Sequence, residues 1–277
     1  MSTENALLTI LVEKINNDTL VLPTLPAIAL KVRKAADDPD INLHKMGDVI
    51  SQDPSLSARI IKIANSAYLG RSVKVNSISQ AATRIGLSQI KNISTALAME
   101  QLFVSRNDLV KDYITKVWNN TVDVVANAMA ALQVYSKGHR GKLNLDTLTL
   151  AALVHNIGVL PILTEAERHE DVFANPTFLN VAIQKLSCPI GAKIMLDWGF
   201  EDAFVKVAEK WRDMDYQTDN VSYIDFVRLG AVLAGAFDSH KDDVMNLSQK
   251  KGMFEDLSVL QSDEFIEMRD NAKAIFA

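Results

Sequence analysis

Apolar residues recur along this chain at the three- and four-residue spacing of an α-helix, from residue 6 almost to the last residue. No long run alternates apolar and polar residues, as a half-buried β-strand would. Because this period decides which side chains can share one buried face, it predicts an all-α, multi-helical protein. The chain has 277 residues, of which 48% are hydrophobic, so it can bury a sizeable core.

Local signals place the helix boundaries. Asn42 is expected to cap a helix that runs to about Ser51, and Asp53 before Pro54 combines an N-cap with a proline at the first helical position. Ser77 or Ser79 opens a helix that ends at Gly86. Further helices are predicted over residues 6–15, 27–36, 87–104, 108–135, 145–160, 176–186, 189–196, 201–211, 223–237 and 262–276. The pattern "TEAE" at 164–167 predicts a capping box that starts another helix after Pro161.

Several broad classes of protein are disfavoured. The apolar runs fall short of the roughly 20 residues of a membrane span, and the first residues lack a basic region and a cleavage site, so we expect a cytoplasmic protein. The single cysteine, Cys188, excludes an internal disulfide and a zinc site made of several thiolates. The net charge of −5 argues against bulk binding of nucleic acid, and no membrane partner is expected.

The charge is unevenly distributed. Residues 55–99 contain no Asp or Glu but six Lys or Arg residues. They are either ordinary solvated helix faces, whose counter-charges come from elsewhere in the fold, or a basic surface for an acidic protein or a phosphorylated ligand.

The segment "LAALVHNIGVL", residues 150–160, holds the most suggestive polar residues. His155 shares an apolar helix face with Leu148, Ala151 and Val159, so it is expected to point into the core or into a pocket within it. A lone histidine in this setting is usually a hydrogen-bonded core residue rather than a metal ligand. Asn156 can form hydrogen bonds, but it brings no charge to offset the desolvation of a divalent metal ion.

No other pattern in the sequence indicates catalysis. The remaining histidines lie in separate predicted elements without ligand spacing, and they are His44, His139, His169 and His240. There is no phosphate-binding glycine loop and no nucleophile elbow, and Cys188 precedes Pro189 without a local histidine. We therefore expect no catalytic residue, no metal and no cofactor.

Three blocks resemble the N-terminal half of an HDOD domain, a regulatory branch of the HD phosphohydrolase superfamily. They are "LPTLPAIALKV", "VISQDPSLSARIIKIANSAYLG" and "VNSISQAATRIGLSQIKNI", in the family's order and spacing. The later blocks "VWNNTVDVVANAMA", "LAALVHNIGVL" and "IGAKIMLDWGF" resemble its HD-like half. The resemblance covers residues 20–237. It implies an N-terminal helix over 1–19, the first HDOD half over 20–106, the HD-like half over 107–239 and a polar C-terminal tail with a helix over 240–277.

The resemblance also implies what has become of the metal site. Metal-dependent members of the superfamily use a histidine on the long helix, an adjacent His-Asp pair and a later aspartate. Here the first position falls near Asn120, the pair is His155-Asn156, and the last falls near Ala231. Where many relatives have a further histidine, this chain has Ser187 or Cys188. The resemblance therefore implies a dismantled metal site, in which Asn120, His155 and Asn156 form a buried polar network that is structural or lines a pocket for a small regulator.

These observations predict a non-enzymatic signal-transduction protein that binds a signalling protein or a small regulatory ligand, in an oligomeric state that the sequence leaves open. The alternatives are a metal-dependent phosphohydrolase with an atypical HD-type site and a nucleotide-sensing receptor. The candidate residues of the binding surface are Arg59, Lys62, Asn65, Arg71, Lys74 and Arg84. Asn65 can equally be a C-cap that ends its helix.

Overall fold

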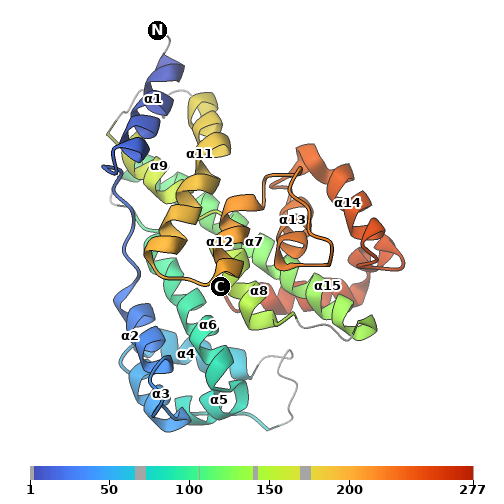
Figure 1. Ribbon diagram of the computed structural model, residues 1–277. Coiled ribbons are helices and arrows are strands. Elements are labelled where there is room, and N and C mark those ends of the chain that lie inside the picture. Colours follow the sequence, from blue (N-terminus) through green and yellow to red (C-terminus); the bar gives the residue numbers. More distant parts are fainter. Residues whose placement is uncertain (1–2, 66–72, 106, 140–142, 169–175, 277) are drawn as a thin grey trace. The chain divides into compact units, whose positions relative to one another are not determined.

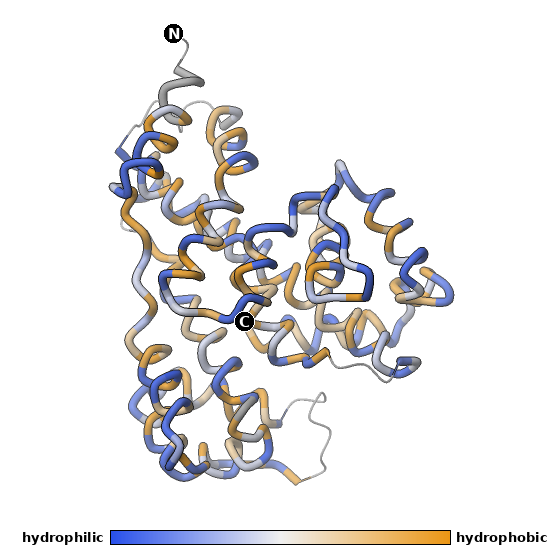
Figure 2. The backbone as a smooth tube through the Cα atoms, in the orientation of Figure 1, coloured by the Kyte–Doolittle hydropathy of each residue, from blue (hydrophilic) through white to orange (hydrophobic). Residues whose placement is uncertain are grey.

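The structure is a computed structural model that describes residues 3–65, 73–105, 107–139, 143–168 and 176–276. Within these ranges the regular elements are α-helices and short 3₁₀ helices, and there is no strand (Figure 1). The predicted all-α class is confirmed. Orange apolar and blue polar residues alternate along the helices in Figure 2, as the helical period of the sequence requires.

The helices form two compact units, and each unit is assembled from separated stretches of the chain. The first consists of Met1–Thr24, Leu102–Asn119 and Val154–Gln217, and the second consists of Leu25–Gln101, Asn120–Leu153 and Thr218–Ala277. The units thus alternate along the sequence, whereas the sequence-based division expected consecutive ranges. The long helix α7 (Asp108–Gly138) contributes its first residues to one unit and the rest to the other.

The first unit contains α1 (Thr3–Asn16), α9 (Val159–Ala166), α11 (Pro176–Asp197) and α12 (Asp202–Lys210). Helix α11 packs against α9, α12 and α1. Two polar contacts fix the N-terminal segment to this core. The Lys14 ammonium lies 2.7 Å from a carboxylate oxygen of the buried Glu165, and the Trp198 indole donates to the Pro23 carbonyl at 3.1 Å.

The second unit begins with five short helices, followed by most of α7. These helices are α2 (Ala27–Ala36), α3 (Leu43–Ile50), α4 (Pro54–Ala64), α5 (Ile78–Ile85) and α6 (Leu87–Ala98). The later helices are α8 (Leu145–Val154), α13 (Tyr223–Leu233), α14 (Lys241–Lys250) and α15 (Asp263–Lys273). At Gly230 a Cβ atom would lie 2.5 Å from the Val124 carbonyl oxygen, so α13 needs a glycine to approach α7.

The predicted start signals are confirmed in the first hundred residues. The side chains of Asn42, Asp53 and Ser77 accept hydrogen bonds from the backbone three residues later, at 2.9, 3.0 and 3.2 Å. Pro54 occupies the first turn of α4, and Gly86 takes a φ of 92° between α5 and α6. Of the two predicted N-cap residues of α5, Ser77 and Ser79, the structure has Ser77 as the cap.

The helix predicted over 145–160 is wrong in its extent. The structure has α8 ending at Val154, a turn over residues 155–158, and then α9. The predicted capping box at 164–167 is also wrong, because Thr164 lies inside α9 and donates from its hydroxyl to the Leu160 carbonyl at 3.0 Å. Pro161 is accommodated in the first turn of α9, where a backbone N–H has no intrahelical partner to lose.

The number of helices also differs from the prediction in two regions of the chain. The separate helices expected over 176–186 and 189–196 are one helix, α11, which contains Pro189. Helix α14 was not predicted, because the polar composition of residues 241–250 hides its few buried positions, Val244 and Ser248.

One apolar stretch, Leu145–Ala166, is long and apolar enough to span a membrane by length and composition. In the structure 83% of its most apolar 18-residue window is buried inside the protein. The stretch serves as core, and it carries the turn with His155 and Asn156.

Candidate functional site

The turn between α8 and α9 is held tightly against α11. The backbone N–H groups of Ile157 and Val159 donate to the carbonyls three residues earlier, at 3.0 and 3.1 Å. A Cβ atom on Gly158 would lie 2.0 Å from the Ser187 carbonyl oxygen and 2.5 Å from the Gly191 nitrogen. Only glycine permits this approach, so Gly158 fixes the position of the His155-Asn156 pair beside Ser187.

His155 is buried, with 3% of its surface exposed, and its ring meets the Trp211 ring edge to face at a centroid distance of 4.7 Å. The sequence-based expectation that His155 points into the interior is confirmed. It lies on a turn, however, rather than on the helix face that the periodicity suggested.

Three more polar side chains complete this cluster: Ser187 and Cys188 from α11, and Arg212 from the turn that follows α12. The Arg212 guanidinium lies 4.1 Å from the centre of the Trp211 ring, an arrangement that partly stabilises its charge. Burial lowers the pKa of Arg212. Burial also raises the pKa of the Cys188 thiol, while the Arg212 charge and backbone N–H lower it by less. Cys188 is therefore a neutral thiol near pH 7, not an activated nucleophile.

The cluster contains buried polar atoms with few partners among the described residues. Asn156 Oδ1 and Arg212 Nε have no hydrogen-bond partner there, and Ser187 Oγ has only the neighbouring Cys188 thiol. Buried polar atoms in native proteins are nearly always paired, so these three can hydrogen-bond a small polar guest such as a water molecule.

The described residues around His155 do not fit the divalent metal ion that HD phosphohydrolases use. Within the described ranges no three His, Cys, Asp or Glu side chains come together in a geometry that could hold a metal ion. The cluster around His155 offers a neutral amide, a hydroxyl and a protonated thiol, and Arg212 adds a positive charge that repels a cation.

The expected buried network does not extend to Asn120. This side chain is exposed on α7, and the buried polar residue next to it is Thr121. The expectation that Asn120 is buried is therefore not met. Ala231, the position aligned with the last metal ligand, is buried on α13 in the second unit and has no ligand atom in its side chain.

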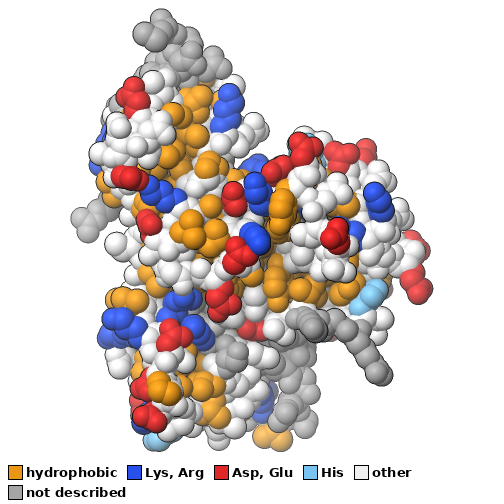
Figure 3. All heavy atoms as spheres, in the orientation of Figure 1, with side chains coloured by type: hydrophobic (Ala, Val, Ile, Leu, Met, Phe, Trp, Pro, Cys, Tyr) orange, Lys and Arg blue, Asp and Glu red, His pale blue; other side chains and the backbone are white. Residues whose placement is uncertain are grey.

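The basic segment 55–99 is not one free positive surface. Arg59 forms an ion pair with Glu100. Arg84 donates to the carbonyls of Ala64, at 3.0 Å, and Val73. On the face of the molecule drawn in Figure 3, both Lys or Arg and Asp or Glu side chains are exposed.

Asn65 is the C-cap of α4, which was one of its two predicted roles. Its side-chain amide donates to the Val75 carbonyl and accepts from the Val75 backbone N–H, both at 2.8 Å. Lys62 and Lys74 remain exposed, and Arg71 lies outside the described residues. Two of the six predicted surface residues, Asn65 and Arg84, thus hold the chain between α4 and α5.

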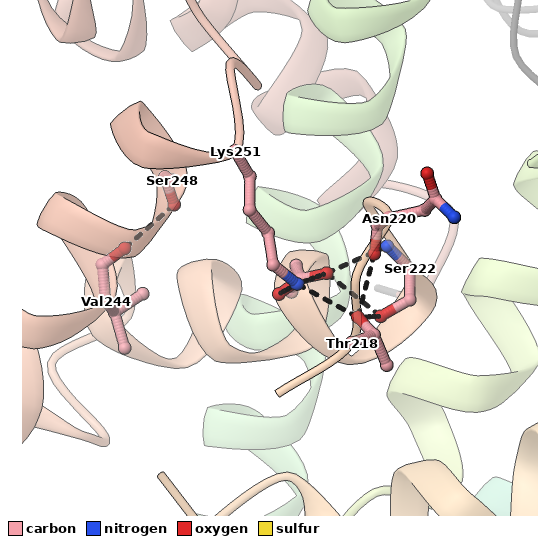
Figure 4. Close-up of polar contacts among 7 residues, drawn as sticks. Thr218, Asn220, Ser222, Val244, Ser248 and Lys251 are labelled. Atoms are coloured by element: carbon pink, nitrogen blue, oxygen red, sulfur yellow. Dashed lines mark hydrogen bonds and ion pairs between the residues drawn. The ribbon is translucent and has the colours of Figure 1, made fainter. Parts of the chain in front are cut away.

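A buried ion pair in the second unit had no signal in the sequence. The Lys251 ammonium lies 2.7 and 2.8 Å from the two carboxylate oxygens of Asp225, and these side chains are only 8% and 3% exposed (Figure 4). Thr218 accepts a third hydrogen bond from Lys251 at 2.9 Å, and the Ser222 hydroxyl and backbone N–H donate to Asp225. Every charge is matched, so the group is a structural clamp.

Trp211, which lies beside His155, and Arg212, which lies over the Trp211 ring, were not predicted from the sequence as members of this site. Their only local signal is the aromatic-basic pair in "EKWRDMD", at the end of an amphipathic helix. Such a pair is common on protein surfaces, and its position beside the turn depends on the packing of α11 against α12.

Comparisons with known proteins agree with this architecture. A solved structure from Shewanella amazonensis SB2B, named a "putative metal-dependent phosphohydrolase", is 42% identical, covers 100% of both chains and superposes with a TM-score of 0.94. An HDOD domain protein of unknown function from Geobacter sulfurreducens is 17% identical, with a TM-score of 0.63 over 98% of this chain and 99% of that chain, and it supports the fold alone.

A curated relative, an uncharacterized protein of Treponema pallidum (strain Nichols), is 24% identical over 190 residues. The match covers 69% of this chain but only 35% of that relative. Residues 22–213 match the HDOD domain family, which is more than half of the chain. This protein therefore belongs to the HDOD family.

Proposed function

We propose that this protein is a non-enzymatic component of bacterial signal transduction, which acts by binding a partner protein or a small ligand on an HDOD scaffold. The observation that carries the proposal is the set of residues around the His155-Asn156 turn. Asn156 stands where the resemblance expects an anionic aspartate, the neutral thiol of Cys188 or the hydroxyl of Ser187 stands where it expects a histidine, and the half-buried Arg212 guanidinium adds a positive charge. Without a bound metal ion, the cluster lacks the divalent cation that activates a water molecule in these hydrolases.

The second candidate is a metal-dependent phosphohydrolase. It is favoured by the 42% identity to the Shewanella amazonensis protein of that name and by His155, the one metal-ligand type kept at its expected position. This candidate requires ligands other than the residues that surround His155 in the structure. It therefore predicts a metal whose loss follows the removal of His155.

Metal analysis and an assay of phosphoester hydrolysis separate the two candidates. The purified protein, incubated with Mn²⁺, Fe²⁺, Ni²⁺ or Zn²⁺ and then desalted, is expected to retain far less than one metal ion per chain. Hydrolysis of bis-p-nitrophenyl phosphate should stay at the buffer rate, with and without His155→Ala. A stoichiometric metal that is lost in His155→Ala, together with hydrolysis that needs it, would refute the non-enzymatic proposal.

A nucleotide receptor that uses the basic segment is less supported, because Arg59 and Arg84 are engaged inside the second unit. Calorimetric titration with guanine nucleotides tests it directly. Binding that disappears on reversal of Arg59 and Lys62 to Glu would restore this candidate.

A further inference from the structure

A groove of about 430 Å³ lies in the second unit, between the end of α7 and the chain that follows α14. Its volume lies within the range of about 300–1,000 Å³ that is usual for ligand sites. Its lining includes the aromatic, apolar and acidic side chains of Tyr135, His139, Met253, Phe254, Glu255 and Asp256. None of them contributed to the resemblance to HDOD domains or to the cluster around His155.

One wall of the groove is aromatic and held in place. The rings of Tyr135 and His139 stack at 4.1 Å with an angle of 8° between their planes. The edge of Phe226 packs against Tyr135 at 5.4 Å, and His139 Nδ1 donates to the Tyr135 carbonyl oxygen at 3.0 Å. His139 is exposed, so this wall is accessible from solvent. Met253 and Phe254 are buried and add apolar surface to the lining.

The described lining of the groove is also negatively charged. Glu255 and Asp256 line it, and no Lys or Arg is among its described lining residues. The Asp256 carboxylate accepts hydrogen bonds from the Ser258 backbone N–H, at 2.9 Å, and from the Ser258 hydroxyl. These bonds fix its orientation and lower its pKa, so it stays ionised at neutral pH. Glu255 is exposed and forms no ion pair within the described part of the chain.

We infer that this groove binds an arginine side chain presented by a partner protein. A guanidinium is planar and can lie against an aromatic ring while its N–H groups point toward carboxylate oxygens. The groove offers both features within one volume. A lysine ammonium would meet the charge but gain less from the flat aromatic wall. The inference rests on the proposed function, since it specifies the kind of partner that such a scaffold would bind.

Titration of the isotope-labelled full chain with acetyl-Gly-Arg-Gly-amide, followed by NMR, tests the inference. The backbone signals of Tyr135, His139 and residues 252–256 should shift and saturate. The lysine peptide should bind more weakly, and the citrulline peptide, a neutral isostere of arginine, should bind at least tenfold more weakly. Shifts of equal size with citrulline, shifts confined to other residues or no shifts at all would each overturn the inference.

Matched variants keep the test independent of folding. Glu255→Gln removes an exposed carboxylate of the groove and should weaken binding of the arginine peptide about fivefold. Glu267→Gln removes an equally exposed carboxylate on α15, outside the groove, and should leave the affinity unchanged. Equal effects of the two variants would show that only the overall negative charge attracts the peptide, and the inference would fail.

The outcome can be separated from that of the proposed function. If the protein binds no metal, hydrolyses no phosphoester and does not bind the arginine peptide, only the inference about the groove is refuted. A metal-dependent hydrolase would refute the non-enzymatic proposal, whatever the peptide does.

Discussion

At the scale of single residues, Gly158 decides how closely the His155-Asn156 turn approaches α11. A Cβ atom at this position would meet the Ser187 carbonyl oxygen and the Gly191 nitrogen, and these backbone atoms cannot rotate away from a new methyl group as a flexible side chain could. The position of the whole polar cluster thus depends on one missing Cβ atom.

Gly158→Ala should lower the free energy of unfolding by about 3 kcal/mol, the upper end of the usual cost of overpacking, because the added methyl group forces the turn and α11 apart. Urea denaturation followed by circular dichroism measures this change. Gly138→Ala is the matched control, since a Cβ atom at Gly138 meets nothing within 4 Å and should change stability by less than about 1 kcal/mol. Equal effects of the two substitutions would contradict the assigned role of Gly158.

Cys188 gives a second prediction at this scale. Burial raises its pKa, so the folded protein should react with a thiol reagent such as DTNB at pH 8 far more slowly than the protein unfolded in urea. The raised pKa also means that stability is retained below the ordinary thiol pKa of about 8.5 and decreases as the pH rises above it. Cys188→Ala should lack this part of the decrease. Rapid labelling of the native protein would contradict the prediction.

At the scale of secondary-structure elements, buried polar contacts connect segments whose helical patterns are independent. Arg84 from α5 holds the C-terminal carbonyl of Ala64 in α4, and Lys14 in α1 reaches Glu165 in α9. Lys251, just after α14, reaches Asp225 in the first turn of α13. The contact between Lys251 and Asp225 is the most deeply buried of the three. It is also the one that joins the C-terminal helices α13 and α14.

Lys251→Met should destabilise the protein by about 3–5 kcal/mol, because it leaves the Asp225 carboxylate buried without its partner. The measurement is the free energy of unfolding in urea. Lys250→Met, at the exposed neighbouring position, should change it by less than about 0.5 kcal/mol. If replacing both Lys251 and Asp225 with apolar residues were as harmful as the single change, an unpaired charge would not be the cause.

At the scale of the whole molecule, the two compact units share α7 and alternate along the chain. Cutting at one point of the sequence therefore cannot separate them. All three tryptophans, Trp118, Trp198 and Trp211, belong to the first unit, so tryptophan fluorescence reports on that unit alone.

Thermal or urea unfolding followed by tryptophan fluorescence should coincide with unfolding followed by far-ultraviolet circular dichroism, which reports on the helices of both units. The physical reason is that α7 cannot lose its structure in one unit without weakening the other. A fluorescence midpoint clearly separated from the circular dichroism midpoint would show that the units unfold independently.

The sequence by itself determined the all-α class, the capped helices of the first hundred residues and the resemblance to HDOD domains. These features depend on signals within one or two helical turns, such as Asn42, Asp53-Pro54 and Gly86, or on blocks of consecutive residues. Their physical causes act locally, so they can be recognised without the fold.

Only the tertiary structure decided which polar residues are available for function. It engaged Arg59 and Arg84 in contacts within their own unit, left Asn120 exposed and placed Trp211 beside His155. It also brought the end of α7 to residues 252–256, more than a hundred positions later. Such contacts depend on the packing of helices that are far apart in the chain, and no local pattern of residue types encodes that distance.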